Sequence, residues 1–219
     1  MDNSTKVYTA IKADGLLPLF YNDSAEVCIA LSKALYAAGV QSIEFTNRGY
    51  FALENFKAMV ATRNAEMPGL LLGVGTISTA DEAKQFVAAG ADFLISPFFD
   101  ESVSNAAKTA GVPWIPGAMT PREVHLAKQA GCVMIKLFPG NVLGPGYVEA
   151  ILPLFRGVDF IVTGGVDTEA ENLAKWFKSG VVGVGMGSKL ITKNILANQE
   201  YDRLTEITKA LISTVKNNR

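Results

Sequence analysis

The segment from Val133 to Pro139 places one lysine in an otherwise apolar run that is typical of a buried strand. Because side chains alternate along a strand, Met134, Lys136 and Phe138 share one face and the aliphatic residues share the other. The aliphatic face suits packing against helices, so the lysine is expected to point into a barrel. Desolvation there disfavours the ammonium form and leaves more nucleophilic amine. Lys136 is a candidate Schiff-base former; position alone leaves open a fixed charge that reaches solvent or neutralises a phosphate.

A carboxylate interrupts a second apolar run, Ser42–Thr46, in the same way. By alternation Glu44 faces the barrel interior near the end of the strand, and Arg48 follows in the loop. This strand is the second of eight and the Lys136 strand is the sixth, so the two lie across the barrel and Glu44 can converge with Lys136. Glu44 could then exchange protons with an intermediate, while Arg48 could hold a substrate carboxylate through two hydrogen bonds. The alternative is a structural ion pair.

Glycine-rich turns follow two apolar runs near the end of the chain. Thr163-Gly164-Gly165 follows the seventh run, and Gly187-Ser188 follows the eighth. In (β/α)8 enzymes these two loops often form a phosphate site, because glycines let backbone amides approach the oxygen atoms. The alternative is that the glycines serve tight turns only. Gly73–Thr76, at the end of the third run, adds a hydroxyl group at the same rim.

Metal-dependent and triad chemistry are both disfavoured. His125 is the only histidine and falls within an expected helix, which argues against a Ser-His-Asp triad or a multi-histidine zinc site. Apart from Glu44, the acidic residues fall mostly on helices and turns and form no cluster for a divalent ion. Cys28 and Cys132 lie far apart in apolar contexts, which favours packing over a disulfide. We expect neither a metal nor a cofactor.

The elements that would position these residues alternate along the chain. Helical periodicity marks segments such as Ala25–Ala38, Thr79–Ala89 and Pro121–Ala130, and sequences typical of capping boxes begin the last two. Glycines that can close a helix in the left-handed conformation follow five expected helices, at Gly39, Gly90, Gly111, Gly131 and Gly180. The expected strands are Leu16–Phe20, Ser42–Thr46, Leu70–Val74, Asp92–Ser96, Val112–Ile115, Val133–Phe138, Asp159–Thr163 and Val181–Val184.

Eight strand and helix units without a linker predict an α/β fold, a single (β/α)8 TIM barrel over residues 1–219. The alternative is a doubly wound open sheet. It is disfavoured because no Gly-x-Gly-x-x-Gly turn follows the first strand. Residues Met1–Asp14 and Gln199–Lys216 are expected to form additional terminal helices that cap a barrel end or lie in an oligomer contact.

Composition excludes several classes of protein. Lys plus Arg number 20 and Asp plus Glu number 21, so the formal net charge is −1, without the basic excess typical of nucleic-acid binders. A hydrophobic fraction of 49% with 19% charged residues excludes a disordered chain. No apolar run approaches the ~18 residues that span a membrane, and the polar start lacks the core of a signal peptide, so we expect a cytoplasmic protein.

The sequence resembles the class I 2-keto-3-deoxy-6-phosphogluconate (KDPG) aldolases, whose members often also cleave 4-hydroxy-2-oxoglutarate (KHG). The resemblance runs from about Gly15 to Leu190. It implies a (β/α)8 fold, a homotrimer and no metal. Its motifs, in order, are Ile43-Glu44-Phe45-Thr46-Asn47-Arg48, Gly73-Val74-Gly75-Thr76, Ile95-Ser96-Pro97, Ile115-Pro116-Gly117, Ile135-Lys136-Leu137-Phe138-Pro139, Thr163-Gly164-Gly165 and Gly187-Ser188.

The resemblance also implies roles for individual residues. Lys136 matches the Schiff-base lysine, and Glu44 matches the general acid/base. Arg48 with Thr76 matches the group that receives the pyruvate carboxylate. The matches to the pyruvate pocket are Pro97 and Phe138, and those to the segment around the distal phosphate are Thr163, Gly164, Gly165, Gly187 and Ser188.

The chain departs from the family pattern at four places. Asn47 stands where leucine is expected, Met119 where Ser or Thr often follows Pro-Gly, and Val162 where proline often precedes Thr-Gly-Gly. Phe98-Phe99-Asp100 replaces a smaller turn. None of these touches the proton-transfer pair, so the departures bear on the acceptor aldehyde more than on the reaction type.

We therefore expect an aldolase that cleaves a 2-keto-3-deoxy sugar acid between C3 and C4 to pyruvate and an aldehyde, glyceraldehyde 3-phosphate or glyoxylate. The galactonate epimer is an alternative substrate. One rival is a phosphate-binding barrel isomerase or synthase that uses Lys136 as a fixed charge. Another is a non-catalytic sugar-acid-binding barrel, which the charged set of Lys136, Glu44 and Arg48 disfavours.

Overall fold

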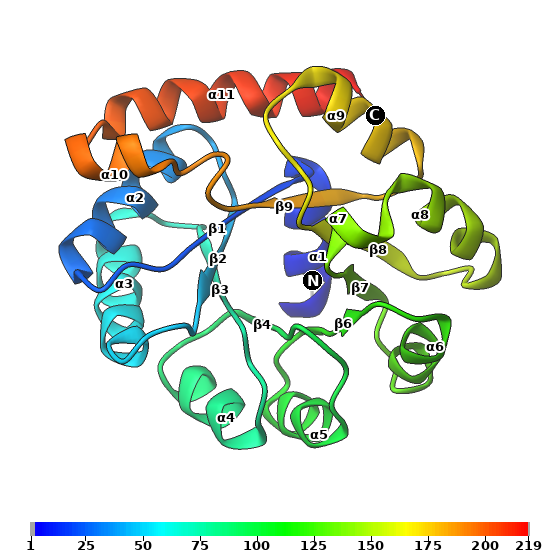
Figure 1. The fold of residues 1–219 in the computed structure, drawn as a ribbon. Helices are drawn as coiled ribbons and strands as arrows, with labels where there is room; N and C mark the ends of the chain where they lie inside the picture. The colour runs from blue at the N-terminus through cyan, green and yellow to red at the C-terminus, as the bar shows by residue number, and fades with distance from the viewer. Residues whose placement is uncertain (1–2, 219) are drawn as a thin grey trace.

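The computed structural model describes residues 3–218 and shows a parallel β-barrel surrounded by helices (Figure 1). The strands follow the order β5-β4-β3-β2-β1-β9-β8-β7-β6, and each paired neighbour is parallel. The barrel prediction is confirmed, and the open doubly wound sheet is excluded. The strands are β1 Leu16–Phe20, β2 Ser42–Thr46, β3 Leu71–Gly75, β4 Phe93–Ile95, β5 Trp114–Ile115, β6 Gly117–Ala118, β7 Met134–Leu137, β8 Asp159–Thr163 and β9 Gly183–Met186.

The fifth strand, expected at Val112–Ile115, begins at Trp114 and resumes after Pro116 as β6, which the sequence pattern does not predict. β5 pairs with β4 and β6 pairs with β7, because proline lacks the N–H that a continuous ladder needs. The carbonyl oxygen of Pro116 still accepts from the Lys136 amide at 2.9 Å, and that of Ile115 accepts from the Ser96 amide at 3.1 Å. The barrel is therefore nearly closed, with β5 and β6 together as its fifth strand.

The last strand lies two residues later than predicted, at β9 instead of Val181–Val184. Glycine is depleted in strands, so the sequence pattern does not predict strand structure through Gly185. Tertiary pairing nevertheless holds this backbone in the sheet, because Gly185 lies opposite Leu17 of β1 and Thr163 of β8.

Helices cover the outside of the barrel (Figure 1). Both predicted capping boxes are present, at Thr79 with Glu82 and at Thr120 with Glu123. All five predicted helix-closing glycines have positive φ, from 65° to 101°. The helices are α1 Asn3–Asp14, α2 Ala25–Ala37, α3 Ala52–Glu66, α4 Ala80–Ala88, α5 Glu101–Ala110, α6 Pro121–Gln129, α7 Gly140–Leu143, α8 Pro145–Ile151, α9 Ala170–Lys178, α10 Lys193–Asn198 and α11 Tyr201–Asn217, with a 3₁₀ turn at Leu152–Leu154.

The helix α1 closes the end of the barrel at which the strands begin. Val7 and Ile11 are fully buried and pack into the interior. This confirms the capping role predicted for the N-terminal segment, of which Met1 and Asp2 lie outside the described residues. The interior residues in the same cluster are Leu17, Leu71, Phe93, Ile95, Ile115, Met134 and Ile161.

The C-terminal helix α11 packs on α2 and α9 at the outer surface. It begins two residues later than predicted because Gln199 has φ 53° and ends α10 in the left-handed conformation. Within residues 3–218, no helix combines the length and the apolar character needed to cross a membrane.

Candidate active site

Lys136 and Glu44 meet inside the barrel, near the end at which the strands finish. Lys136 Nζ donates a hydrogen bond to Glu44 Oε1 at 3.3 Å, across the barrel from β7 to β2. Lys136 is 6% exposed and Glu44 is 1% exposed, so the predicted convergence is confirmed. Removing either partner of a buried ion pair leaves an uncompensated charge, so each residue depends on the other.

The Glu44 carboxylate has one oxygen on the lysine and the other without a partner. Oε2 is buried and accepts no hydrogen bond from any described residue. The neighbouring strand makes room for the group, because a Cβ at Gly75 would overlap the carboxylate. Glu44 is therefore within proton-transfer distance of the amine and has a second oxygen that can accept from a reacting group.

Phe138 lies beside Lys136, and Pro97 lies against the neighbouring strand β6. Lys136 Nζ is 5.4 Å from the centroid of the Phe138 ring, within the range of a cation–π contact. Pro97 follows β4, and its carbonyl group lies against Gly117, which is the partner of Lys136 in the β6–β7 ladder. Phe138 therefore lies next to the amine, whereas Pro97 is one strand away from it.

The loops after β2 and β3 bring Arg48 and Thr76 close in space. The amide of Asn47 donates to the carbonyl of Gly75 at 2.9 Å, which joins the two loops immediately before the two predicted residues. Thr76 has φ 64°, a left-handed conformation that is uncommon for a β-branched residue. Strain of this kind costs about 1–3 kcal/mol and is concentrated at functional sites.

A pocket of about 740 Å³ opens over the ends of β1, β8 and β9. Its lining brings Arg48 together with the predicted phosphate segment, Thr163, Gly164, Gly165, Gly187 and Ser188. Thr163 Oγ1 is buried and has no hydrogen-bond partner among the described residues. The other predicted residues, Lys136, Glu44, Thr76, Pro97 and Phe138, do not line this pocket.

Lys189 and Lys193 also line the pocket, and the sequence analysis missed both. With Arg48 they place three cations around it, against the single carboxylate of Asp167. Both lysines follow the Gly187-Ser188 turn, but nothing in the sequence places them beside Arg48. The charge of the lining favours an anionic ligand.

The glycines after β8 are explained by backbone geometry. Gly164 and Gly165 have φ 94° and 73°, and a Cβ on Gly165 would lie 2.8 Å from the Asn141 backbone of α7. Only glycine adopts this conformation readily in such a close approach. The geometry of a tight turn is therefore enough to explain the two glycines. The evidence for an anion site comes from the cationic side chains of Arg48, Lys189 and Lys193.

A protein-family model described as "KDPG and KHG aldolase" matches residues 7–207. The chain belongs to this aldolase family. The aldolase is 30% identical over 210 residues to the 2-dehydro-3-deoxy-phosphogluconate aldolase of Treponema pallidum, covering 95% of this chain and 97% of that protein. It is 29% identical over 213 residues to the KHG/KDPG aldolase of Escherichia coli, covering 97% of each chain.

The aldolase is also similar to a solved structure of KDPG aldolase from Legionella pneumophila, in which pyruvate is captured as a covalent carbinolamine intermediate. The TM-score is 0.84 at 28% identity, with 92% of this chain and 96% of that chain covered. Members of the family are class I pyruvate aldolases, so this chain is a carbon–carbon lyase. The isomerase and non-catalytic alternatives are therefore disfavoured.

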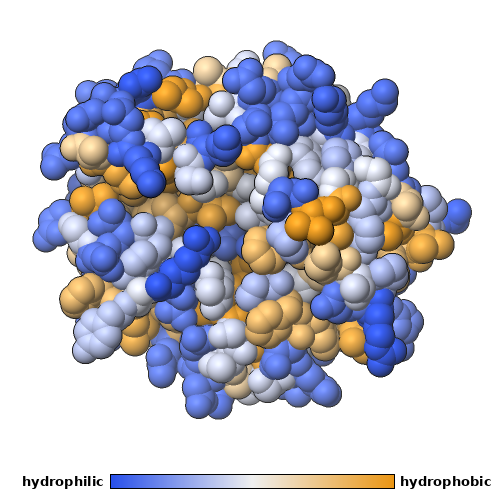
Figure 2. Space-filling view, in the orientation of Figure 1, coloured by the Kyte–Doolittle hydropathy of each residue, from blue (hydrophilic) through white to orange (hydrophobic). Residues whose placement is uncertain are grey.

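Two of the departures from the family pattern form hydrogen bonds that hold loops in the aldolase. Asn47 Nδ2 donates to Glu82 Oε1 at 3.1 Å, which ties the loop after β2 to the capping box of α4. Asp100 caps α5 by accepting from the Val103 amide at 3.0 Å. Phe98 and Met119 remain 43% and 42% exposed, and hydrophobic side chains lie among hydrophilic ones on the face where the strands end (Figure 2).

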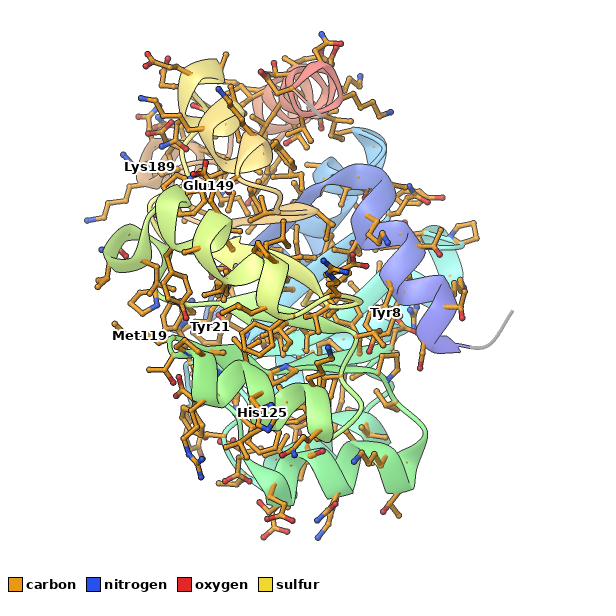
Figure 3. The ribbon with its side chains drawn as sticks, turned by 90° about the vertical axis from the view of Figure 1, so that its right-hand side faces the viewer. Tyr8, Tyr21, Met119, His125, Glu149 and Lys189 are labelled. Atoms are coloured by element: carbon orange, nitrogen blue, oxygen red, sulfur yellow. The ribbon has the colours of Figure 1, made fainter. Side chains whose placement is uncertain are left out.

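Residues that could support other chemistry lie elsewhere in the aldolase. His125 is exposed on α6, away from the strand ends (Figure 3). Burial raises the pKa of the Cys28 and Cys132 thiols to about 11, and neither is in a disulfide. Among residues 3–218, no three His, Cys, Asp or Glu side chains gather as metal ligands would.

Proposed function

We propose that Lys136 forms an imine with the C2 ketone of a 2-keto-4-hydroxy acid. The amine adds to C2, and the carbinolamine loses water to give a protonated imine. Cleavage between C3 and C4 then sends the bonding electrons to the imine nitrogen and releases the aldehyde. Protonation of the enamine at C3 and hydrolysis return pyruvate and the free amine. The buried Lys136–Glu44 contact at 3.3 Å is the observation that carries this proposal.

Glu44 moves the protons in this scheme. It transfers a proton during carbinolamine formation, removes the proton of the C4 hydroxyl group directly or through water, and returns one to the enamine. Its position beside the amine and its second, unpartnered oxygen support these roles. Arg48 and Thr76 hold the substrate carboxylate, and Pro97 with Phe138 lines the pyruvate pocket.

The substrate we propose is KDPG, KHG or both, giving glyceraldehyde 3-phosphate or glyoxylate as the aldehyde. Both acids carry an anionic group beyond C4. The pocket around Thr163, Gly164, Gly165, Gly187 and Ser188, with Lys189 and Lys193 in its lining, supports binding of that group. Only KDPG has a distal phosphate, so the lysines favour it over the shorter acid.

The C4 epimer, 2-keto-3-deoxy-6-phosphogalactonate, is the second candidate substrate. It has the same charges and length as KDPG and differs only in the direction of one hydroxyl group. Thr163 Oγ1, which is buried without a partner and lines the pocket, is available to a substrate hydroxyl group. Discrimination between the epimers therefore depends on which configuration presents its C4 hydroxyl to this side of the barrel.

The experiment measures pyruvate release from KDPG, its C4 epimer and KHG, coupled to lactate dehydrogenase. The proposal expects kcat/KM to be highest for KDPG, and it expects Lys189→Ala to lower kcat/KM for KDPG more than for KHG. Turnover of none of the three would contradict the proposed substrates. Equal decreases in kcat/KM for KDPG and KHG would show that Lys189 does not bind the distal phosphate.

A homotrimer, as the family resemblance implies, is the proposed assembly. Large hydrophobic side chains are exposed in the segments that follow strands, including Tyr50 at 95% after β2 and Val142 at 61% in α7, and supply apolar area for such a contact. Native mass spectrometry tests this directly. A species at three times the chain mass of 23.4 kDa is expected, and a monomer at micromolar concentration would contradict it.

A further inference from the structure

Tyr21 occupies a junction between the first two loops at the end where the strands finish (Figure 3). It follows β1 and lines the same pocket as Arg48. Its hydroxyl group donates to Asp23 Oδ1 at 2.5 Å within its own loop. The hydrogen bond to Asp23, followed by desolvation, raises the pKa of Tyr21, while a backbone hydrogen bond with Phe51 acts in the opposite direction. The phenol therefore contacts both loops.

The Tyr21 ring is fitted against the backbone that carries Arg48. A Cβ on Gly49 would overlap the phenol ring and its oxygen, so the ring packs directly on the residue after Arg48. The other side of the ring lies against Phe45 of β2, with centroids 5.7 Å apart. Glycine at position 49 is required by this close approach, because any side chain there would displace the ring.

Hydrogen bonds from Asn55 also connect the loop after β1 to the helix that follows Arg48. Asn55, at the start of α3 and 6% exposed, donates its amide to the carbonyl oxygens of Asn22 and Asp23 at 3.0 and 2.9 Å. Arg48 itself is exposed and forms no ion pair with any described residue. The position of the guanidinium group thus depends on its backbone, which the first loop supports.

We infer that Tyr21 is a positioning residue that holds Arg48 in place for the substrate carboxylate. This inference rests on the proposed role of Arg48. Loss of the phenol oxygen would remove the hydrogen bond that anchors the ring to Asp23, so the ring would support the backbone at Gly49 less firmly. Arg48 would then sample more positions, and substrate would bind less tightly. The chemical step at Lys136 would be little affected, because Tyr21 does not contact Lys136 or Glu44.

The test is the exchange of pyruvate methyl protons in D2O, followed by NMR, because it needs no aldehyde. Tyr21→Phe is expected to raise the KM for pyruvate by about 3–10-fold, the scale of one lost hydrogen bond, with kcat within about two-fold of the parent. The matched control is Tyr36→Phe, which removes a phenol hydrogen bond to the Pro68 carbonyl away from the site. It is expected to leave both constants unchanged.

A double-variant cycle shows whether Tyr21 acts through Arg48. In an Arg48→Ala background, Tyr21→Phe should change KM by less than about two-fold, since there is no guanidinium group left to position. The inference would be overturned if Tyr21→Phe raised KM by the same factor with and without Arg48. It would also be overturned if Tyr21→Phe, like the Tyr36→Phe control, left KM unchanged. If Tyr21→Phe does not fold, Asp23→Asn is used instead, because it weakens the same hydrogen bond from an exposed position. It is expected to raise the KM for pyruvate in the parent and to have little effect in the Arg48→Ala background.

The two levels of the proposal fail in different ways. If Arg48→Ala leaves the KM for pyruvate unchanged, the proposed carboxylate role of Arg48 is wrong, and the inference falls with it. If Arg48→Ala raises KM while Tyr21→Phe and Asp23→Asn do not, the role of Arg48 stands and only the inference about Tyr21 is wrong.

Discussion

The two ends of the barrel interior are built by the same strands but are filled differently. At the end closed by α1, inward positions hold Leu71, Ile115, Met134 and Ile161, all at most 2% exposed. Two residues after Ile115, Met134 and Ile161, the inward positions hold Gly117, Lys136 and Thr163. The α1 end is a packed apolar layer, whereas the other end combines small residues with polar ones.

Within a single strand, the residues near α1 therefore contribute mainly to stability, and those at the other end contribute to the site. Apolar side chains that fill the α1 end contribute burial free energy and leave no polar group to satisfy. At the other end the small residues leave space for long polar side chains, and Glu44 Oε2 and Thr163 Oγ1 have no partner among the described residues. Unsatisfied buried groups cost stability, so an unpartnered oxygen on Glu44 beside Lys136 and another on Thr163 in the pocket lining are typical of a site that binds a ligand.

The largest effect is expected from removal of the Lys136 amine. Lys136→Met should reduce turnover to the limit of detection, because Lys136 is the only buried lysine among the described residues and the only one paired with Glu44. The lost ion pair leaves Glu44 buried without its partner, so the variant is also expected to be less stable by about 3–5 kcal/mol. Turnover and thermal unfolding are both measured.

A matched variant separates these two effects. Lys136→Met combined with Glu44→Gln leaves no unpaired buried charge and should recover part of the stability without recovering turnover. Parent-like rates in either variant would show that the chemistry lies elsewhere.

Glu44→Gln alone should slow proton transfer by roughly 10²–10⁴-fold while keeping the shape of the side chain. The measurement is exchange of pyruvate methyl protons in D2O, which reports removal of a proton from the imine. An exchange rate equal to that of the parent enzyme would remove Glu44 from the mechanism.

Two glycines of β3 test the difference between the two ends of the barrel within one strand. A Cβ at Gly73 would overlap the ring of Phe93, in the apolar layer, whereas a Cβ at Gly75 would overlap the Glu44 carboxylate. Gly73→Ala should lower the free energy of unfolding by about 1–3 kcal/mol with kcat nearly unchanged. Gly75→Ala should lower kcat by about 10²-fold through displacement of Glu44. Equal effects of both variants on stability and kcat would contradict the separation.

The smallest effect is expected outside both regions, at the two thiols. Burial raises the pKa of Cys28 and Cys132 to about 11, so at pH 8 only about 0.1% of each is the reactive thiolate. Iodoacetamide should therefore label the native protein slowly and leave activity intact, with labelling increasing as the pH rises toward 11. The chain unfolded in guanidinium provides the control. Rapid labelling with loss of activity would place a thiol in the site.

The alternation of apolar strands and capped helices was enough to predict the barrel, and the intrusion of Lys136 and Glu44 into two strands was enough to predict their convergence. The alternation and the two charged residues can be recognised within single segments, and the convergence follows once the count of eight strands places the second opposite the sixth. The split at Pro116 and the strand through Gly185 depend on pairing with neighbours, which outweighs the low strand propensity of proline and glycine.

Contacts between segments distant in sequence explain what the sequence analysis missed. Asn47 pairs with Glu82, and Tyr21 packs on Gly49, but no spacing rule connects either pair. Lys189 and Lys193 look like ordinary surface lysines until the loop after β9 is placed beside the pocket. A positional rule would have found Tyr21, since it directly follows the end of β1, where a barrel carries its functional residues.

Imine formation at Lys136 is tested by borohydride reduction of the protein in the presence of pyruvate, followed by intact-mass measurement and peptide mapping. Borohydride reduces an imine to a stable secondary amine, so we expect one pyruvyl adduct per chain, on the peptide that contains Lys136, and no adduct in Lys136→Met. An adduct on another lysine, or none while pyruvate binding is demonstrated under the same conditions, would contradict imine formation at Lys136.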